Sequence, residues 1–229
     1  MPSICRGIVG SYLNMDQVIR IAYTLSCALC TCLFVFYADR KILGKKQSKK
    51  IFTTAEVVGV LTSAACGFVL YDRIGNHYIN AFRIMIIVGV LAGAAYCDYS
   101  ERKISNLFFI ILLGTFLICS FLEWIILKES LLTLLSGGFI SGLIIFVFFM
   151  LLRLVSKGGI GYGDIKLCTG MGFAFGLYGC IYVLIIGQLV ALILVILGLL
   201  LHKLTMKGTI PLAPFLFIGL IGTVLMGTF

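Results

Sequence analysis

Charged residues are scarce in this chain of 229 residues: Asp, Glu, Lys and Arg together make up 12%, whereas 61% of the residues are hydrophobic. A soluble domain carries roughly 25% charged and about 45–50% apolar residues, so this composition excludes a soluble globular fold. Proline is also rare, at 3 residues, while glycine reaches 26. Glycine is enriched where membrane helices pack closely against one another. The composition therefore predicts an all-α, polytopic integral membrane helical bundle.

The apolar residues fall into about eight stretches, each near the length of about 20 residues that a helix needs to cross a bilayer. We expect about six to eight transmembrane helices in a single membrane domain that covers residues 1–229. Only Tyr178 and Gly179 separate the sixth and seventh stretches, which predicts a tight hairpin or a partly re-entrant sixth stretch. The stretches are roughly 18–37, 54–71, 81–97, 106–122, 131–152, 164–180, 181–201 and 210–227.

The formal net charge is +9, but the basic residues lie in short loops between the apolar stretches, which argues against nucleic acid as a partner. Segment 40–50 carries six of these residues. Because short loops rich in Lys and Arg stay in the cytoplasm, we expect this segment to be cytoplasmic and to contact anionic lipid. Alternation then places segments 98–105, 153–163 and 202–209 on the same side and both termini outside. The pattern predicts a multi-pass protein of the cytoplasmic (inner) membrane.

Two of the nine carboxylates stand at the ends of apolar stretches. Asp98 directly follows the third stretch and Asp164 opens the sixth, and the predicted topology puts both at the cytoplasmic face. Two carboxylates held together share one proton, which is the arrangement that an aspartic peptidase uses to activate water. Two other interpretations stay open. In the first, both acids are structural: Asp98 pairs with Arg102, and Asp164 stabilises the N-terminus of its helix. In the second, both acids form the proton or ion site of a small transporter.

Residues that bind metals offer no coherent set in the sequence. The chain has only 2 histidines, and the predicted topology places His77 and His202 on opposite sides of the membrane. Cys27 and Cys30 have the C-x-x-C spacing, but they lie inside the first apolar stretch and lack a second pair. A zinc site needs four ligands, usually in two separated pairs. We therefore expect neither a metal nor a cofactor.

Three motifs resemble those of type IV prepilin peptidases, the intramembrane aspartyl peptidases of pilus assembly. Gly161-Tyr162-Gly163-Asp164-Ile165-Lys166-Leu167 is similar to their G-x-G-D-[VI]-K-[LM] motif. Segment 98–106 is similar to their D-x5-I-P-N motif, with Ser105 in place of the usual proline. Segment 210–215 resembles the proline-rich start of their last helix. The resemblance covers a peptidase core of about residues 54–229.

The resemblance implies an aspartic endopeptidase that removes a short basic leader from prepilin or pseudopilin precursors at the cytoplasmic face, cutting after a glycine. Asp98 and Asp164 would be catalytic. The resemblance gives Gly161, Gly163, Lys166 and Asn106 supporting or substrate-positioning roles.

Longer members of that family also methylate the new N-terminus, with an insertion that carries two C-x-x-C pairs. This chain lacks that insertion, so we do not expect N-methyltransferase activity. A presenilin-like peptidase is an alternative, although its first acid follows tyrosine directly and here Cys97 intervenes. The identity of the precursor and the oligomeric state stay open. Ser105 also leaves the geometry of its segment open, since it can cap the next helix where proline would stiffen it.

Overall fold

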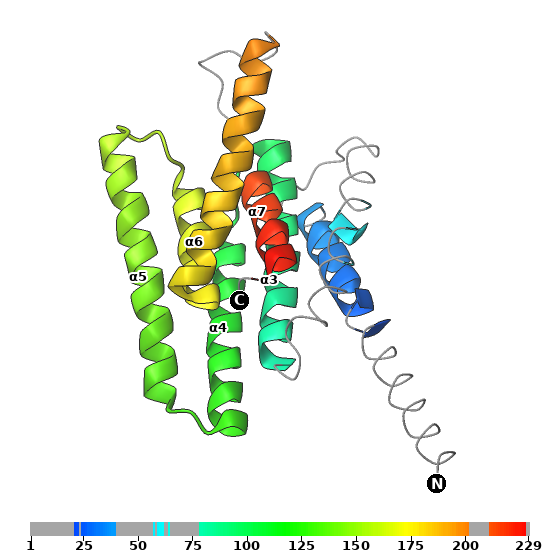
Figure 1. Ribbon diagram of the computed structural model, residues 1–229, viewed down its shortest axis with the longest axis vertical. Helices are drawn as coiled ribbons and strands as arrows, with labels where there is room; N and C mark the ends of the chain where they lie inside the picture. The colour runs from blue at the N-terminus through cyan, green and yellow to red at the C-terminus, as the bar shows by residue number, and fades with distance from the viewer. Residues whose placement is uncertain are drawn as a thin grey trace.

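The computed structural model describes residues 21–22, 24–39, 57, 59–61, 64, 78–201 and 211–227, and every regular element in this part of the chain is a helix (Figure 1). Four helices are long and apolar enough to cross a membrane, and two apolar helices are shorter. The prediction of a polytopic helical membrane bundle is confirmed. The helices are Thr24–Tyr37, α3 (Tyr78–Glu101), α4 (Asn106–Leu127), α5 (Leu131–Val155), α6 (Tyr162–Leu200) and α7 (Ala213–Met226).

Most predicted stretches coincide with observed helices. Serine residues define two of the starts: the Ser105 hydroxyl accepts a hydrogen bond from Leu107 N at 3.3 Å, and the Ser130 hydroxyl accepts one from Thr133 N at 3.2 Å. Serine is a favoured residue at this position because its oxygen satisfies an amide that the helix leaves unpaired. The predicted cap at Ser105 is therefore confirmed. The predicted stretch 54–71 lies almost entirely outside the described residues.

The long helix α6 consists of two segments that meet at Gly176. This glycine has φ 74° and ψ 178°, a backbone conformation that is essentially limited to glycine. The Cys180 thiol lies 3.7 Å from the carbonyl oxygen of Cys168, twelve residues earlier, so the second segment folds back against the first. In a continuous helix twelve residues would span about 18 Å. The predicted break at Tyr178–Gly179 is wrong by two residues, because the reversal uses Gly176.

The two segments of α6 differ in length. The first, Tyr162 to Phe175, rises about 21 Å, less than the roughly 30 Å of a hydrocarbon core. The second, from Leu177 to Leu200, is long enough to cross and extends above the other helices in Figure 1. The first segment is therefore too short to cross the bilayer by itself, and the second segment returns the chain toward the end of the bundle where α6 begins.

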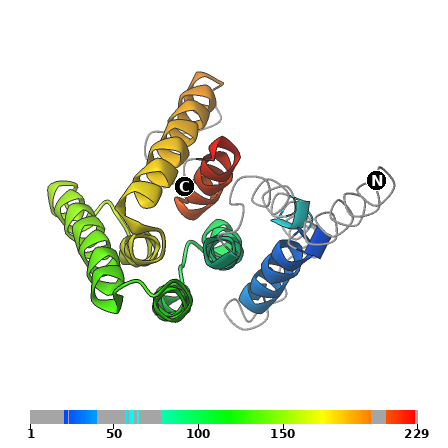
Figure 2. The same cartoon turned by 60° about the horizontal axis from the view of Figure 1, so that its bottom comes forward.

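Helix α6 lies at the centre of the packing, against α5, α7 and α4, while α3 packs against α7 and α4 (Figure 2). Glycines allow the close approaches. A Cβ atom on Gly219 would lie 2.8 Å from Gly187 N, and one on Gly172 would lie 3.1 Å from Gly142 Cα. In lipid no hydrophobic effect drives helices together, so their association depends on close van der Waals packing of this kind.

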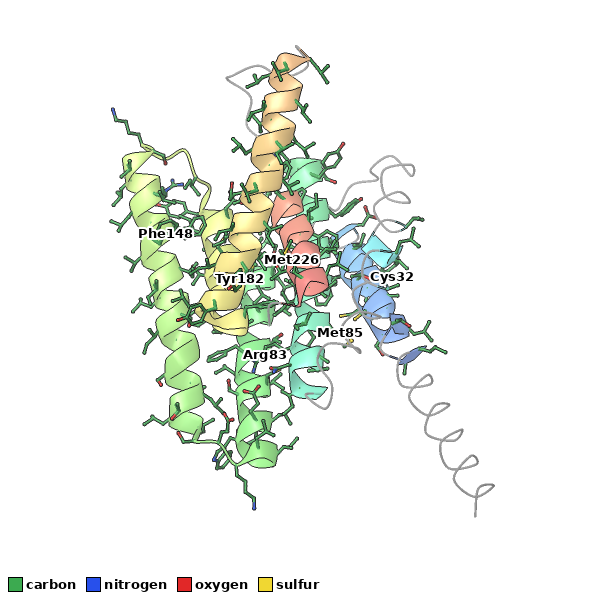
Figure 3. All side chains as sticks on the ribbon, viewed as in Figure 1. Cys32, Arg83, Met85, Phe148, Tyr182 and Met226 are labelled. Carbon is green, nitrogen blue, oxygen red and sulfur yellow. The ribbon has the colours of Figure 1, made fainter. Side chains whose placement is uncertain are left out.

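An ion pair joins α3 to α4 in the lower half of the bundle. Arg83 Nη2 lies 2.6 Å from Glu123 Oε1, and Figure 3 shows Arg83 on the lower part of α3. A charge inside an apolar helix is costly unless it has a partner, and here each side chain supplies one for the other. This contact stabilises the scaffold at the end opposite the candidate site.

Candidate active site

The ends of several helices converge at one end of the bundle. Figure 1 shows α3 and α5 ending, and α6 and α7 beginning, in its upper half. Asp98 lies in the last turn of α3, and Asp164 lies in the first turn of α6. The structure therefore brings the two predicted acids to the same end of the bundle, and their charges are near enough to interact.

Asp98 is buried, with 6% of its surface exposed, and the start of α7 holds it. Its Oδ2 accepts a hydrogen bond of 2.9 Å from the backbone amide of Ala213, and the amide of Leu212 also faces the carboxylate. The first amides of a helix have no partner within the helix and carry a partial positive charge, so a carboxylate is a favourable partner for them. Pro214 occupies the first turn of α7, where proline starts a helix without losing a hydrogen bond.

Asp164 has a more open setting. Gly161 precedes its helix, and the backbone amide of that glycine lies beside the carboxylate. Asp164 Oδ1 is buried and has no hydrogen-bond partner among the described residues. A buried oxygen without a partner is costly, and such groups often belong to sites that bind a ligand or water. The Oδ1 atom of Asp164 can therefore accept a hydrogen bond from a ligand or water, whereas the amide of Ala213 holds the carboxylate of Asp98 in place.

The glycines of the G-x-G-D motif occupy positions with little room for a side chain. A Cβ atom on Gly163 would lie 3.0 Å from the Cβ of Ile104, and one on Gly161 would lie 3.1 Å from Asp164 Oδ2. Ile104 belongs to the motif that starts at Asp98. The absence of a side chain on Gly163 thus lets the two aspartate motifs touch directly.

A polar contact joins the same two motifs. Lys166 Nζ donates a hydrogen bond of 2.8 Å to Asn106 Oδ1, and both side chains are exposed. Lys166 lies half a turn after Asp164 on α6, and Asn106 is the first residue of α4. The structure therefore places all six predicted site residues at one end of the bundle. Their roles in chemistry remain predictions.

A cavity of about 740 Å³ opens beside Asp164. Its walls come from α5, from the second segment of α6, from the loop before α6 and from Leu212. Phe148 on α5 is one of the aromatic residues of the wall (Figure 3). Asp164 and Gln188 are the polar side chains among the described residues that line this cavity. The remaining side chains that line this cavity are apolar.

Arg153 fixes the loop between α5 and α6. Its guanidinium donates a hydrogen bond to the carbonyl oxygen of Ile160 and lies 3.8 Å from the centre of the Tyr162 ring. A guanidinium over an aromatic ring is attracted to the negative face of the ring. Arg153, the first residue of the segment 153–163 that we expect to be cytoplasmic, therefore holds the backbone of the loop that precedes Asp164.

Sequence reasoning missed two features of this end of the bundle. It did not find the amide of Ala213 as the partner of Asp98, although the two prolines around that residue mark a helix start whose amides need acceptors. It also overlooked Gln188, a polar residue inside a long apolar stretch. Cys27 and Cys30 both lie on helix Thr24–Tyr37, and neither forms a disulfide within the described part of the chain.

A sequence model of the type IV leader peptidase family matches residues 85–196. The matched range contains both aspartates and the four supporting residues, and it ends before α7. No curated protein and no solved structure matches this chain.

Proposed function

We propose, because a model of the type IV leader peptidase family matches residues 85–196, that this chain is an aspartic endopeptidase that removes short basic leaders from prepilin-like precursors. The observation that carries the proposal is the placement of Asp98 and Asp164 at one end of the bundle, near enough for their charges to interact. Two such carboxylates share a proton, so one can accept a proton while the other donates one.

In the proposed reaction, the ionised carboxylate takes a proton from a water molecule as the water oxygen attacks the carbonyl carbon of the scissile peptide. The protonated carboxyl group donates its proton to the developing oxyanion. The tetrahedral intermediate then collapses and the C–N bond breaks: one carboxyl group of the pair gives its proton to the leaving amine, and a hydroxyl of the intermediate returns its proton to the other carboxylate, so the pair again holds one proton. Asp98, held by the Ala213 amide, gives the pair a fixed member. Asp164, with Oδ1 free, faces the cavity.

The supporting residues would keep this geometry. The hydrogen bond from Lys166 to Asn106 and the contact of Gly163 with Ile104 fix the start of α6 against the segment that follows Asp98. Small displacements of reacting groups cost large factors in rate, so a site of two acids on different helices needs such links. We assign Gly161, Gly163, Lys166 and Asn106 to this role.

The cavity supports an apolar substrate segment. Its walls are mostly aliphatic and aromatic, which suits a precursor whose leader is followed by an apolar helix in the bilayer.

The basic loops suggest that this end of the bundle faces the cytoplasm. Labelling of single cysteines at Lys46 and Lys157 should then report the cytoplasm, and labelling at Asn76 and Glu129 the outside. A cytoplasmic Glu129 would contradict the proposed face.

The activity can be tested with a recombinant precursor made of a short basic leader, a glycine and an apolar helix of about 20 residues. The purified chain in detergent or vesicles should release the leader by a cut after the glycine. Mass spectrometry of the product should show a new N-terminus without a methyl group, even when a methyl donor is supplied. An intact precursor would contradict the proposed substrate class. Methylation that depends on Cys27 or Cys30 would contradict the assignment as a peptidase alone.

A further inference from the structure

Gln188 is a polar residue in an apolar wall. It lies on the second segment of α6, is exposed at the surface, and lines the same cavity as Asp164. Among the described residues, no group forms a hydrogen bond with its amide. A polar group that faces hydrocarbon without a partner is costly, so polar side chains in membrane helices are usually retained for a function.

The reversal at Gly176 sets the height of Gln188 relative to Asp164. The contact of the Cys180 thiol with the Cys168 carbonyl brings these two positions level. Asp164 lies four residues before Cys168 on the first segment, and Leu184 lies four residues after Cys180 on the second. Asp164 and Leu184 are therefore also level, and both line the cavity. Gln188 follows four residues later, about 6 Å closer to the end of the bundle where α6 begins.

A peptide bond must leave the helical conformation before an acid pair can hydrolyse it. The backbone on either side of that bond then loses its internal hydrogen bonds, and in an apolar cavity its N–H and C=O groups need new partners. The amide of glutamine offers both a donor and an acceptor, whereas the aliphatic wall offers neither. Asp164 is needed for the chemistry, so Gln188 is the polar side chain of the wall that is left for this task.

We propose that Gln188 binds the extended backbone of the precursor on the leader side of the scissile bond, one turn beyond Asp164. The precursor's apolar helix occupies the rest of the cavity, and its leader leaves at the end of the bundle where α6 begins. This assignment rests on the proposed function and adds a substrate-binding residue to it.

Replacement of Gln188 by residues without an amide tests the assignment. Gln188→Leu and Gln188→Met should lower kcat/KM for the recombinant precursor about tenfold, as expected for the loss of two hydrogen bonds, while Gln188→Asn keeps an intermediate rate. Thermal stability should not fall, because an aliphatic side chain suits the apolar wall of this cavity. Leu189→Ala is the matched control: Leu189 is adjacent and exposed but does not line the cavity, so its kcat/KM should stay unchanged.

The two levels of the proposal fail in different ways. If the wild-type chain cuts the precursor and Gln188→Leu does so with equal kcat/KM, the role of Gln188 is wrong and the proposed function stands. If the wild-type chain does not cut, the proposed function falls and the role of Gln188 falls with it.

Cross-linking locates the contact directly. A photoreactive amino acid placed at position 188 in the inactive Asp98→Asn, Asp164→Asn double variant should cross-link to the precursor within a few residues of the cut, on the leader side. The same probe at position 189 should not. A cross-link confined to the middle of the apolar helix, or none from position 188, would overturn the assignment.

Discussion

The backbone amide of Ala213 donates a hydrogen bond of 2.9 Å to Oδ2 of Asp98, although the two residues lie 115 positions apart in the chain. Through this contact the start of α7 fixes an acid at the end of α3. The match to the family ends at residue 196, so the element that holds the first acid lies beyond the matched range. Asp98 therefore has a structural role, as the acceptor of this hydrogen bond, in addition to its proposed chemical role.

Asn and Ala substitutions at Asp98 should have different effects. Asn keeps an oxygen that can accept the Ala213 amide, so Asp98→Asn should insert and unfold like the wild type while cleavage is abolished. Asp98→Ala leaves that amide without a partner, which should cost about 1–3 kcal/mol of stability in addition to the activity. Thermal unfolding in detergent and cleavage of the precursor measure the two effects. Substantial cleavage by Asp98→Asn would remove Asp98 from the acid pair.

The second acid should behave as part of the same unit. Asp164→Asn should abolish cleavage, and the double variant should be no slower than the slower single variant, because residues that act together show non-additive losses. A further large loss in the double variant would show that the two acids act independently.

Ser105 stands where the resembled family usually has proline, and the structure explains why either residue fits. Its φ of −71° is close to the value that proline imposes, and its hydroxyl caps α4. Ser105→Pro should therefore keep activity, with a stability close to that of the wild type. Ser105→Ala loses the cap without gaining stiffness, which should cost about 1 kcal/mol. A larger loss in Ser105→Pro than in Ser105→Ala would contradict this account.

Features with a local pattern could be predicted from the sequence, and features that depend on distant partners could not. The cap at Ser105 follows from a serine before an apolar run. The partner of Arg83 lies 40 residues away on another helix, so no local pattern shows it. The reversal in α6 was predicted two residues too late, because the segment contains several glycines and their φ angles are set by tertiary packing. The sequence does not show that Gln188 and Asp164 line the same cavity, because that placement depends on the reversal in α6.

Gly163 should not tolerate a side chain. In Gly163→Ala the new Cβ would meet Ile104 at 3.0 Å, so either the start of α6 or the segment after Asp98 must move. We expect cleavage to fall between about tenfold and a hundredfold, since small displacements of reacting groups have effects of this size. Gly114→Ala is the control, because a Cβ there has no neighbour within 4 Å. Equal activity of the two variants would show that this contact does not position the acids.

Gly176 should be required for the reversal in α6. No neighbour lies within 4 Å of a Cβ built there, so space is not the constraint, but its φ of 74° with ψ of 178° strains any other residue. Gly176→Ala should lower the free energy of unfolding by about 1–3 kcal/mol. Gly137→Ala, in the interior of α5 and also without a close neighbour, should be neutral or stabilising. A neutral Gly176→Ala, by thermal unfolding against this control, would contradict the strained conformation.

The pH profile tests the proposed chemistry most directly. An acid pair works with one proton, so cleavage should fall at low pH as a second proton joins the pair and at high pH as the shared proton leaves. The two limbs then belong to the pair rather than to one residue each. Water activated by two carboxylates needs no metal, so a chelator should leave the rate unchanged across the profile. Initial rates with the recombinant precursor, with and without the chelator, measure both effects. If added zinc restored a chelated enzyme and Asp98→Asn still cut, the acid pair could not be the source of the activated water.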